Sequence, residues 1–207
     1  MMGITTQLKS AAALLVVLLL TGCTGTSPRV DFFMLSADAK PVSGVAGSCS
    51  SQAISVGPVS WPRYLDQPRI VTRAGTNRLE ANEFNRWGGS LEDDFVRITI
   101  KNLSGLLQSE LVVNYRRSSR YAPAYRVEMD VLRFDGALGG DVVLEVKWNV
   151  IAEATGKIEL VTTSSIQKGT SGPDYEALVN ASSMALAELS EEIATQLASV
   201  CTAAPPK

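Results

Sequence analysis

Histidine is absent from the 207-residue chain. This absence excludes Ser–His–Asp and Cys–His catalysis, and every metal site that needs an imidazole ligand. The sequence also has no Cys-x-x-Cys pair and no Gly-x-x-x-x-Gly-Lys-[Ser/Thr] phosphate loop, so the chain is not itself an ATPase. Its net charge of −2 is unlike that of a nucleic-acid-binding protein. We therefore expect no catalytic residues, no metal, no cofactor and no nucleic-acid partner.

Long apolar runs are scarce, and the most pronounced one lies near the N-terminus. It covers Leu14–Leu20, follows Lys9, and is shorter than the roughly 20 apolar residues of a membrane-spanning helix. This arrangement is typical of a signal peptide and disfavours the alternative of a membrane-anchor helix. The next residues, Leu20-Thr21-Gly22-Cys23, resemble the lipobox of bacterial lipoproteins. We predict that residues 1–22 are removed and that the Cys23 thiol carries the lipid.

The predicted lipid on Cys23 determines where the protein resides. About three acyl chains, at about 0.8 kcal/mol per buried CH₂, make membrane attachment in effect permanent. Residues 23–30 form a short tether that keeps the folded body close to the bilayer. Thr24, rather than Asp, follows the cysteine. By resemblance to the sorting rule of bacterial lipoproteins, this favours the outer membrane, with the domain facing the periplasm.

Two cysteines remain in the mature chain. Cys49 lies in a Gly/Ser-rich loop, and Cys201 follows the last predicted helix. Export places both where disulfides form. A bridge between them would tie the start of the domain to its end and would stabilise it by about 5 kcal/mol in the chain-entropy model. We predict this disulfide, and two unpaired thiols are the alternative.

Alternating apolar and polar residues predict a mostly antiparallel sheet. Three consecutive strands are expected at 125–134, 142–150 and 158–167, and they would form an antiparallel meander. The alternation changes phase at Leu132, which predicts a β-bulge there. Shorter strands are predicted at 32–35, 54–59, 69–73, 78–81 and 110–115.

Two helices are predicted from apolar residues at helical spacing. The first begins at Ser90, where Asp93 three residues later resembles a capping box, and it ends near Gln108. The second is expected to use Ser171 as its cap and to end near Ser199. No repeat or long linker divides the mature chain. We therefore predict a single α+β domain over residues 31–200, with two helices packed on the sheet, followed by a tail at 201–207.

The most suggestive surface segment is the proline-flanked loop around Trp61, Arg63, Tyr64 and Leu65. Exposed Trp, Tyr and Arg are enriched at the centres of protein interfaces, so the loop is a candidate partner contact. The alternative is local packing of the aromatic side chains against the domain. The apolar stripe of Trp87, Leu91 and Phe95 is interpreted as core rather than as a ligand pocket.

Two charged clusters allow a structural and a functional interpretation. The acidic run Glu92-Asp93-Asp94 is expected to complement the dipole at a helix start and to face solvent, and a metal site is the alternative. The basic residues Arg116, Arg117 and Arg120 are expected in a solvated loop. Their functional interpretation is contact with lipid headgroups or an acidic partner.

Several segments of the mature chain follow one another in an order that is also typical of a known protein family. They are Asp31–Leu35, Ile54–Val59 leading into Pro62–Leu65, Ile70–Arg73, Asn85–Asp93 before the first helix, Phe134–Gly136, and Asp174–Val179 at the start of the last helix. In this order the chain resembles the ABC-type transport auxiliary lipoproteins, the PqiC-type component of MCE lipid-transport systems. The Cys49/Cys201 pair and the double glycine after Trp87 depart from the family's pattern.

This resemblance implies a role rather than a reaction. Such proteins are outer-membrane-anchored accessory subunits of intermembrane lipid transport and contribute to outer-membrane integrity. The implied partners are an MCE-domain protein and an ABC permease and ATPase, or an equivalent membrane component, and some members form homo-oligomeric rings. Two other interpretations remain: a structural or assembly lipoprotein of the envelope, and a periplasmic hydrolase using paired carboxylates. The sequence shows no such carboxylate pair.

Overall fold

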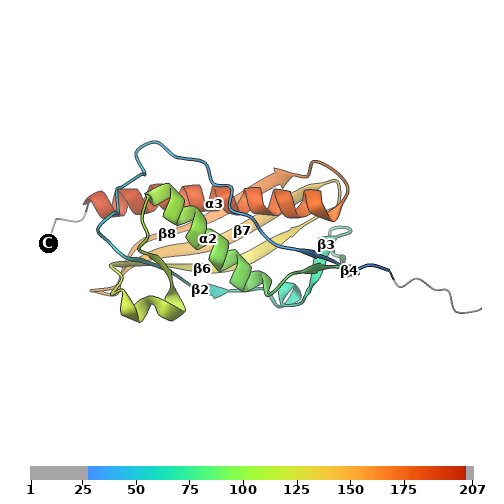
Figure 1. The fold of residues 1–207 in the computed structure, drawn as a ribbon, viewed down its shortest axis with the longest axis horizontal. Helices are drawn as coiled ribbons and strands as arrows, with labels where there is room; N and C mark the ends of the chain where they lie inside the picture. Colours follow the sequence, from blue (N-terminus) through green and yellow to red (C-terminus); the bar gives the residue numbers. More distant parts are fainter. Residues whose placement is uncertain (1–27, 204–207) are drawn as a thin grey trace, which may run out of the picture.

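The computed structural model describes residues 28–203, without the side chains of Ser118, Ser119 and Ala203. The predicted signal peptide, the lipidation site Cys23 and the last four residues of the predicted tail lie outside this range. The described chain forms one α+β domain, in which two helices lie across one face of a curled sheet (Figure 1). The predicted fold class and the number of long helices are therefore confirmed.

The strands and helices follow one another along the chain in an irregular alternation. In order they are β1 (Asp31–Phe33), β2 (Ile54–Ser60), the 3₁₀-helix η1 (Arg63–Leu65), β3 (Arg69–Arg73), β4 (Leu79–Trp87), α2 (Leu91–Leu107), β5 (Val112–Asn114), the 3₁₀-helix η2 (Tyr115–Arg120), β6 (Tyr125–Gly136), β7 (Asp141–Ala152), β8 (Lys157–Gly169) and α3 (Tyr175–Ala203).

The sheet is mixed, and the prediction of a mostly antiparallel sheet was wrong. The meander β6–β7–β8 and the β3–β4 pair are antiparallel, as predicted. However, β2 runs parallel to both β5 and β6, β3 meets β6 in parallel, and β1 runs parallel to β4. Each parallel pair joins strands that are not consecutive in the sequence, and alternation within a strand carries no information about its neighbour's direction.

Strand β6 is the centre of this sheet. One of its sides pairs with β7 along nearly its whole length. On its other side, β2 pairs near the start of β6 and β3 pairs only at its end, where Thr72 lies opposite Gly136. The register with β7 shifts between Val131 and Arg133, so the predicted bulge is confirmed. This shift changes which side chains of β6 face the helices beyond that point.

Both helices have a capping side chain at their start. The hydroxyl of Ser90 accepts a hydrogen bond from the Asp93 backbone N–H at 3.3 Å, as predicted for α2. For α3 the predicted cap, Ser171, was wrong, because the Asp174 carboxylate accepts from the backbone N–H of Ala177 at 2.8 Å. The last helix also extends to Ala203, about one turn beyond the predicted end.

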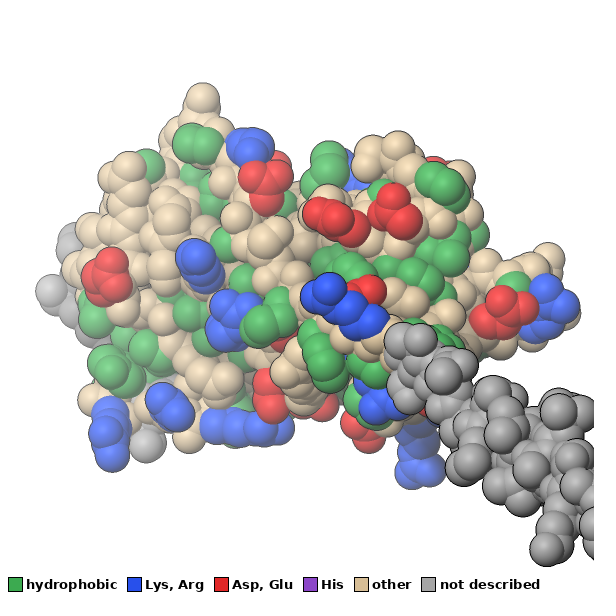
Figure 2. Space-filling model, turned by 45° about the vertical axis from the view of Figure 1, so that its right-hand side comes forward, with side chains coloured by type: hydrophobic (Ala, Val, Ile, Leu, Met, Phe, Trp, Pro, Cys, Tyr) green, Lys and Arg blue, Asp and Glu red, His purple; other side chains and the backbone are tan. Residues whose placement is uncertain are grey.

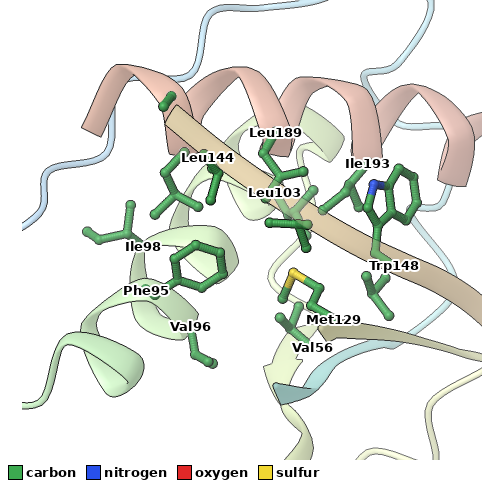
Figure 3. Close-up of a cluster of buried hydrophobic side chains, with 14 of the residues drawn as sticks. Val56, Phe95, Val96, Ile98, Leu103, Met129, Leu144, Trp148, Leu189 and Ile193 are labelled. Carbon is green, nitrogen blue, oxygen red and sulfur yellow. The ribbon is translucent and has the colours of Figure 1, made fainter. Parts of the chain in front are cut away.

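The core lies between the helices and the inner face of the sheet. Phe95 and Leu103 of α2, Leu189 of α3, and Leu144 and Trp148 of β7 converge there (Figure 3), and each is at most 2% exposed. Trp87, Leu91 and Phe95 are all buried, so their interpretation as core is confirmed. Within residues 28–203, no helix is both long and apolar enough to cross a membrane.

Candidate interaction site

The loop around Trp61, Arg63, Tyr64 and Leu65, called the aromatic loop below, packs against the core, and only part of it is exposed to solvent. Trp61 packs edge-on against Phe95 of α2 and Phe134 of β6, with ring centroids 5.4 and 6.2 Å away. Leu65 in η1 is only 4% exposed. These contacts support local packing for Trp61 and Leu65, and they fix the loop's position on the domain.

A cluster of charged side chains around the buried Asp135 carboxylate fixes the same loop to the sheet. The Tyr64 hydroxyl donates a hydrogen bond of 2.7 Å to the carboxylate of Asp135 on β6. Arg73 of β3 donates to both oxygens of that carboxylate, each at 2.7 Å, and Arg133 donates at 3.0 Å. The Asp135 side chain is fully buried, and the two arginines are a quarter to a third exposed. One carboxylate thus joins the loop to two strands.

The cluster fixes the charge state of its members. Burial alone would raise the pKa of the Asp135 carboxyl, but hydrogen bonds from Arg73, Tyr64 and Arg133 outweigh it and hold the pKa below its usual value. Burial, together with the hydrogen bond to Asp135, raises the pKa of the Tyr64 phenol well above its ordinary value. The phenol therefore stays a donor and the carboxylate an acceptor at neutral pH.

Arg63 is the member of the predicted contact set that points to solvent. It lies in η1 between the partly buried Trp61 and the buried Leu65, is exposed, and makes no ion pair within 4.0 Å among the described residues. A cavity of about 210 Å³ separates this loop from the N-terminus of α2, and Trp61, Leu65 and Glu92 are among the residues that line it. The loop therefore presents one cation beside a small recess on a rigid base.

The acidic run at the start of α2 was expected to face solvent, and this holds for two of its three residues. Glu92 and Asp93 face outward, as expected, and approach Arg116 of η2 at 3.6 and 3.5 Å. Asp94, by contrast, is buried, accepts a hydrogen bond of 2.7 Å from the backbone N–H of Leu35, and pairs with Arg97. Within residues 28–203, no group of three His, Cys, Asp or Glu side chains is placed to hold a metal ion.

The basic residues of η2 lie at the surface. Arg116, Arg117 and Arg120 are exposed, and Arg116 is shared between the two α2 carboxylates described above. Tyr115 at the start of the same element lies under the guanidinium of Arg126, 5.3 Å from ring centroid to guanidinium carbon. The structure therefore places the three arginines of this cluster at the solvent-facing surface.

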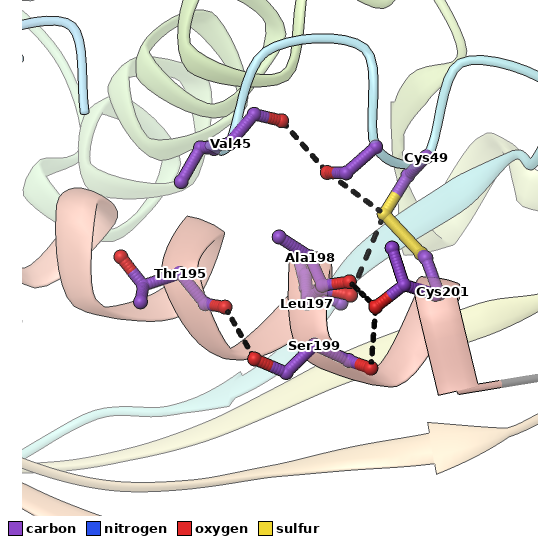
Figure 4. Close-up of a disulfide and its surroundings, with 9 residues drawn as sticks. Val45, Cys49, Thr195, Leu197, Ala198, Ser199 and Cys201 are labelled. Atoms are coloured by element: carbon purple, nitrogen blue, oxygen red, sulfur yellow. Dashed lines mark hydrogen bonds between the residues drawn. A yellow bond between two sulfur atoms is a disulfide. The ribbon is translucent and has the colours of Figure 1, made fainter. Parts of the chain in front are cut away.

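Cys49 and Cys201 are joined by a disulfide with a Cα–Cα distance of 5.6 Å (Figure 4). Cys49 lies in the long loop between β1 and β2, and Cys201 lies in the last turn of α3. The loop is also fixed to α2, because the Gly47 backbone N–H donates to the Leu107 carbonyl at 3.0 Å. The predicted pairing therefore connects the C-terminal ends of both helices through one loop.

Sequence reasoning missed the Asp135 cluster. Asp135 was noted only as part of Phe134–Gly136, and Arg73 only as the end of a strand. The available signal was a carboxylate after the bulge of β6, where the changed phase turns Phe134 toward the core and leaves Asp135 beside Arg133 on the opposite face, under Tyr64 and Arg73. That signal is weak, because Arg73 lies 62 residues away in sequence.

Comparison with known proteins places this chain in a family. The model of the ABC-type transport auxiliary lipoprotein component matches residues 33–194. The chain belongs to this family, as its segment order predicted.

Two solved structures share the fold. Protein XCC0632 from Xanthomonas campestris is 17% identical, with a TM-score of 0.69 over 82% of this chain and 97% of that one. An uncharacterized protein is also 17% identical, with a TM-score of 0.68 over 82% of this chain and 99% of the other. No curated protein sequence matches the chain.

Proposed function

We propose that this protein is a non-enzymatic accessory lipoprotein of an ABC/MCE-type intermembrane lipid transport system. Membership of a family of auxiliary lipoprotein components of ABC-type transport carries the proposal. The absence of histidine from the sequence agrees with a role in binding rather than catalysis. In this role the protein contacts an MCE-domain protein together with its permease and ATPase, or an equivalent membrane component, and supports outer-membrane integrity.

The proposal includes an anchored position for the domain. Lipid on Cys23 holds it on the outer membrane, facing the periplasm, and the Thr24 that follows supports this location over the inner membrane. A short tether then limits the domain to a layer near that membrane. Several copies arranged as a ring would hold the far end of an MCE tunnel there.

The aromatic loop supplies the partner contact in this proposal. Trp61, Tyr64 and Leu65 form a rigid base, and Arg63 is the side chain that reaches the partner. A preorganised loop loses little conformational entropy on binding, which favours its use as a docking element. A single exposed arginine on such a base can pair with a carboxylate of the partner.

The test is affinity isolation of the tagged, full-length lipoprotein from its own envelope after mild crosslinking. We expect an MCE-domain protein and its permease to co-isolate with the wild type, and Arg63→Glu to reduce the yield of both. Lys101→Glu, which reverses an exposed cation in the middle of α2, is the matched control and should co-isolate them normally.

Two results would argue against parts of the proposal. Co-isolation that is equal in Arg63→Glu and in the wild type would keep the transport role and exclude the loop as its docking element. If neither protein yields an MCE-domain partner under conditions that capture a known complex, the chain is better explained as a structural lipoprotein of the envelope.

A further inference from the structure

Three large apolar side chains are exposed at the corner of the sheet where the described chain begins. Phe32 of β1 is 68% exposed, Met34 just after β1 is 56% exposed, and Phe84 of β4 is 42% exposed. We call these three residues the N-terminal patch. Single exposed apolar residues are common, but neighbouring aromatic and Met side chains at one corner mark a contact surface.

The pairing of β1 with β4 explains why Phe32 points outward. Phe32 lies opposite Arg86, and Phe33 lies opposite Trp87. Side chains alternate between the two faces of a sheet, so the burial of Trp87 in the core directs its neighbour Arg86, and with it Phe32, to the opposite face. The exposure of Phe32 therefore follows from the register of the core.

Met34 and Phe84 occupy the same corner for separate reasons. A Cβ atom added to Gly88 would lie 3.0 Å from Cγ of Met34, so the missing side chain at Gly88 is what makes room for Met34. Phe84 precedes Arg86 by two residues and lies in the part of β4 where the register with β3 shifts, between the Arg69–Arg86 and Val71–Ala81 pairs. The side chain of Asn82 fixes this irregular segment by accepting from the Phe84 backbone N–H at 2.8 Å. Fixed backbone on both strands holds the patch in an exposed position.

Arginines surround the patch. Arg69 of β3 lies opposite Arg86 of β4, and both pair with Glu83, at 2.6 and 3.4 Å. Arg29, with a side chain 90% exposed, pairs with Asp31. Three arginines against two carboxylates leave a net charge of +1 at this corner. Figure 2 shows hydrophobic and basic side chains close together near the beginning of the described chain.

The position of the anchor identifies what covers this corner. Phe32 follows Cys23 by nine residues, and an extended chain spans at most about 3.6 Å per residue, so the lipid holds Phe32 within about 32 Å of its own attachment point. Aromatic and apolar side chains flanked by arginines suit the boundary between acyl chains and phosphate headgroups.

We propose that the N-terminal patch inserts shallowly into the lipid surface that carries the anchor. The inference rests on the lipidation of Cys23 in the proposed function. It adds an orientation, because the β7–β8 turn and the end of α3 lie at the other end of the molecule from β1 (Figure 1). With the patch on the bilayer, that far end points away from the membrane.

The test places a fluorescent label on the patch of the full-length lipidated protein. With Cys23 acylated and Cys49 bonded to Cys201, Phe84→Cys introduces a free thiol for an NBD label. The labelled protein is reconstituted in phosphatidylethanolamine and phosphatidylglycerol vesicles, with and without lipids brominated near the headgroup. Phe32→Cys provides a second patch position. Ile158→Cys, at a residue 54% exposed at the far end, is the control.

At both patch positions we expect NBD emission to shift to shorter wavelength on vesicle binding and to be quenched by the brominated lipids. The label at 158 should show neither change. If labels at all three positions stay as in water while the protein floats with the vesicles, the anchor stands and the patch proposal is wrong. A blue shift at the patch without lipid quenching would assign it to a second copy or another protein, which also overturns the proposal. If the protein does not float, the predicted anchor itself fails.

Discussion

At the scale of single residues, Asp135 connects the candidate site to the sheet through its carboxylate. Its fully buried carboxylate accepts four hydrogen bonds from three residues, one from Tyr64, two from Arg73 and one from Arg133. A buried charge is stable in a protein only when its hydrogen-bonding capacity is filled, as it is here. Removing the carboxylate charge would leave two arginines facing each other beneath the aromatic loop.

The lowered pKa of Asp135 predicts a specific dependence of stability on pH. Between its lowered folded pKa and the ordinary value near 4, the unfolded chain binds a proton that the folded chain does not. Stability from this group is therefore fully present above about pH 4 and is lost as the pH falls through the folded pKa. We expect the unfolding free energy of the wild type to fall over that acidic range, and that fall to be smaller in Asp135→Asn.

Asp135→Asn should also be less stable than the wild type at pH 7, by about 2–3 kcal/mol, because charge-assisted hydrogen bonds are weakened. Urea denaturation at a series of pH values measures both effects. Asp130→Asn, at an exposed carboxylate on the same strand, is the control and should change neither. Parallel acid profiles for Asp135→Asn and the wild type would contradict the assignment.

At the scale of elements, the start of α2 contains three acidic residues with different roles. Asp94 fixes the chain after β1 through the Leu35 backbone N–H, whereas Asp93 is exposed and its side chain makes only a long contact with Arg116. We expect Asp94→Ala to reduce the unfolding free energy by about 1–3 kcal/mol, because a buried N–H loses its acceptor. Asp93→Ala should cost less than about 1 kcal/mol, since it loses only a helix-dipole interaction and a surface pair.

Thermal or urea unfolding of these two variants distinguishes the two roles within one acidic run. Equal losses would mean that the run acts through charge alone, as the sequence suggested. A larger loss for Asp94→Ala would show that one carboxylate of the run connects the first strand to the first helix.

The elements themselves were largely predictable from sequence, and their partners were not. The alternation in β6, β7 and β8 and the Ser90 cap are local patterns, and each appears where it was expected. The pairing of β2 with β6 depends on how the intervening α2 and β3–β4 hairpin pack. The periodicity of either strand records only which face is buried. The direction of the sheet therefore could not be derived from the patterns used.

The candidate site shows the same division. Proline and aromatic residues marked the loop around Trp61 and Tyr64 as unusual. Their sequence did not reveal that the Tyr64 hydroxyl meets a carboxylate 71 residues later. Exposure of Arg63, in contrast with burial of Leu65, also depends on how η1 lies on the core. Composition can indicate a candidate contact loop, but packing determines which of its side chains stay exposed for contact with a partner.

At the scale of the whole molecule, the disulfide closes the domain at the end away from β1. It joins residues 152 apart in sequence and ties the β1–β2 loop to the end of α3. That loop also lies along α3, because the backbone N–H groups of Ser36 and Lys40 donate to Ser183 and Glu191 of that helix. The first and last parts of the domain are therefore held together at several points, with one covalent bond among them.

Removing this bond should destabilise the domain without changing its fold. In the chain-entropy model, cross-linking so long a loop stabilises by about 5 kcal/mol, and measured losses of native disulfides are about 2–5 kcal/mol. We therefore expect Cys49→Ala combined with Cys201→Ala to lower the urea midpoint strongly while leaving the far-UV circular dichroism spectrum unchanged. The wild type under reducing conditions should have nearly the same lowered midpoint, because both lose the same cross-link. An unchanged midpoint in the double variant, or two alkylatable thiols in the unreduced mature protein, would mean that the hydrogen bonds of the loop alone hold the two ends of the domain together.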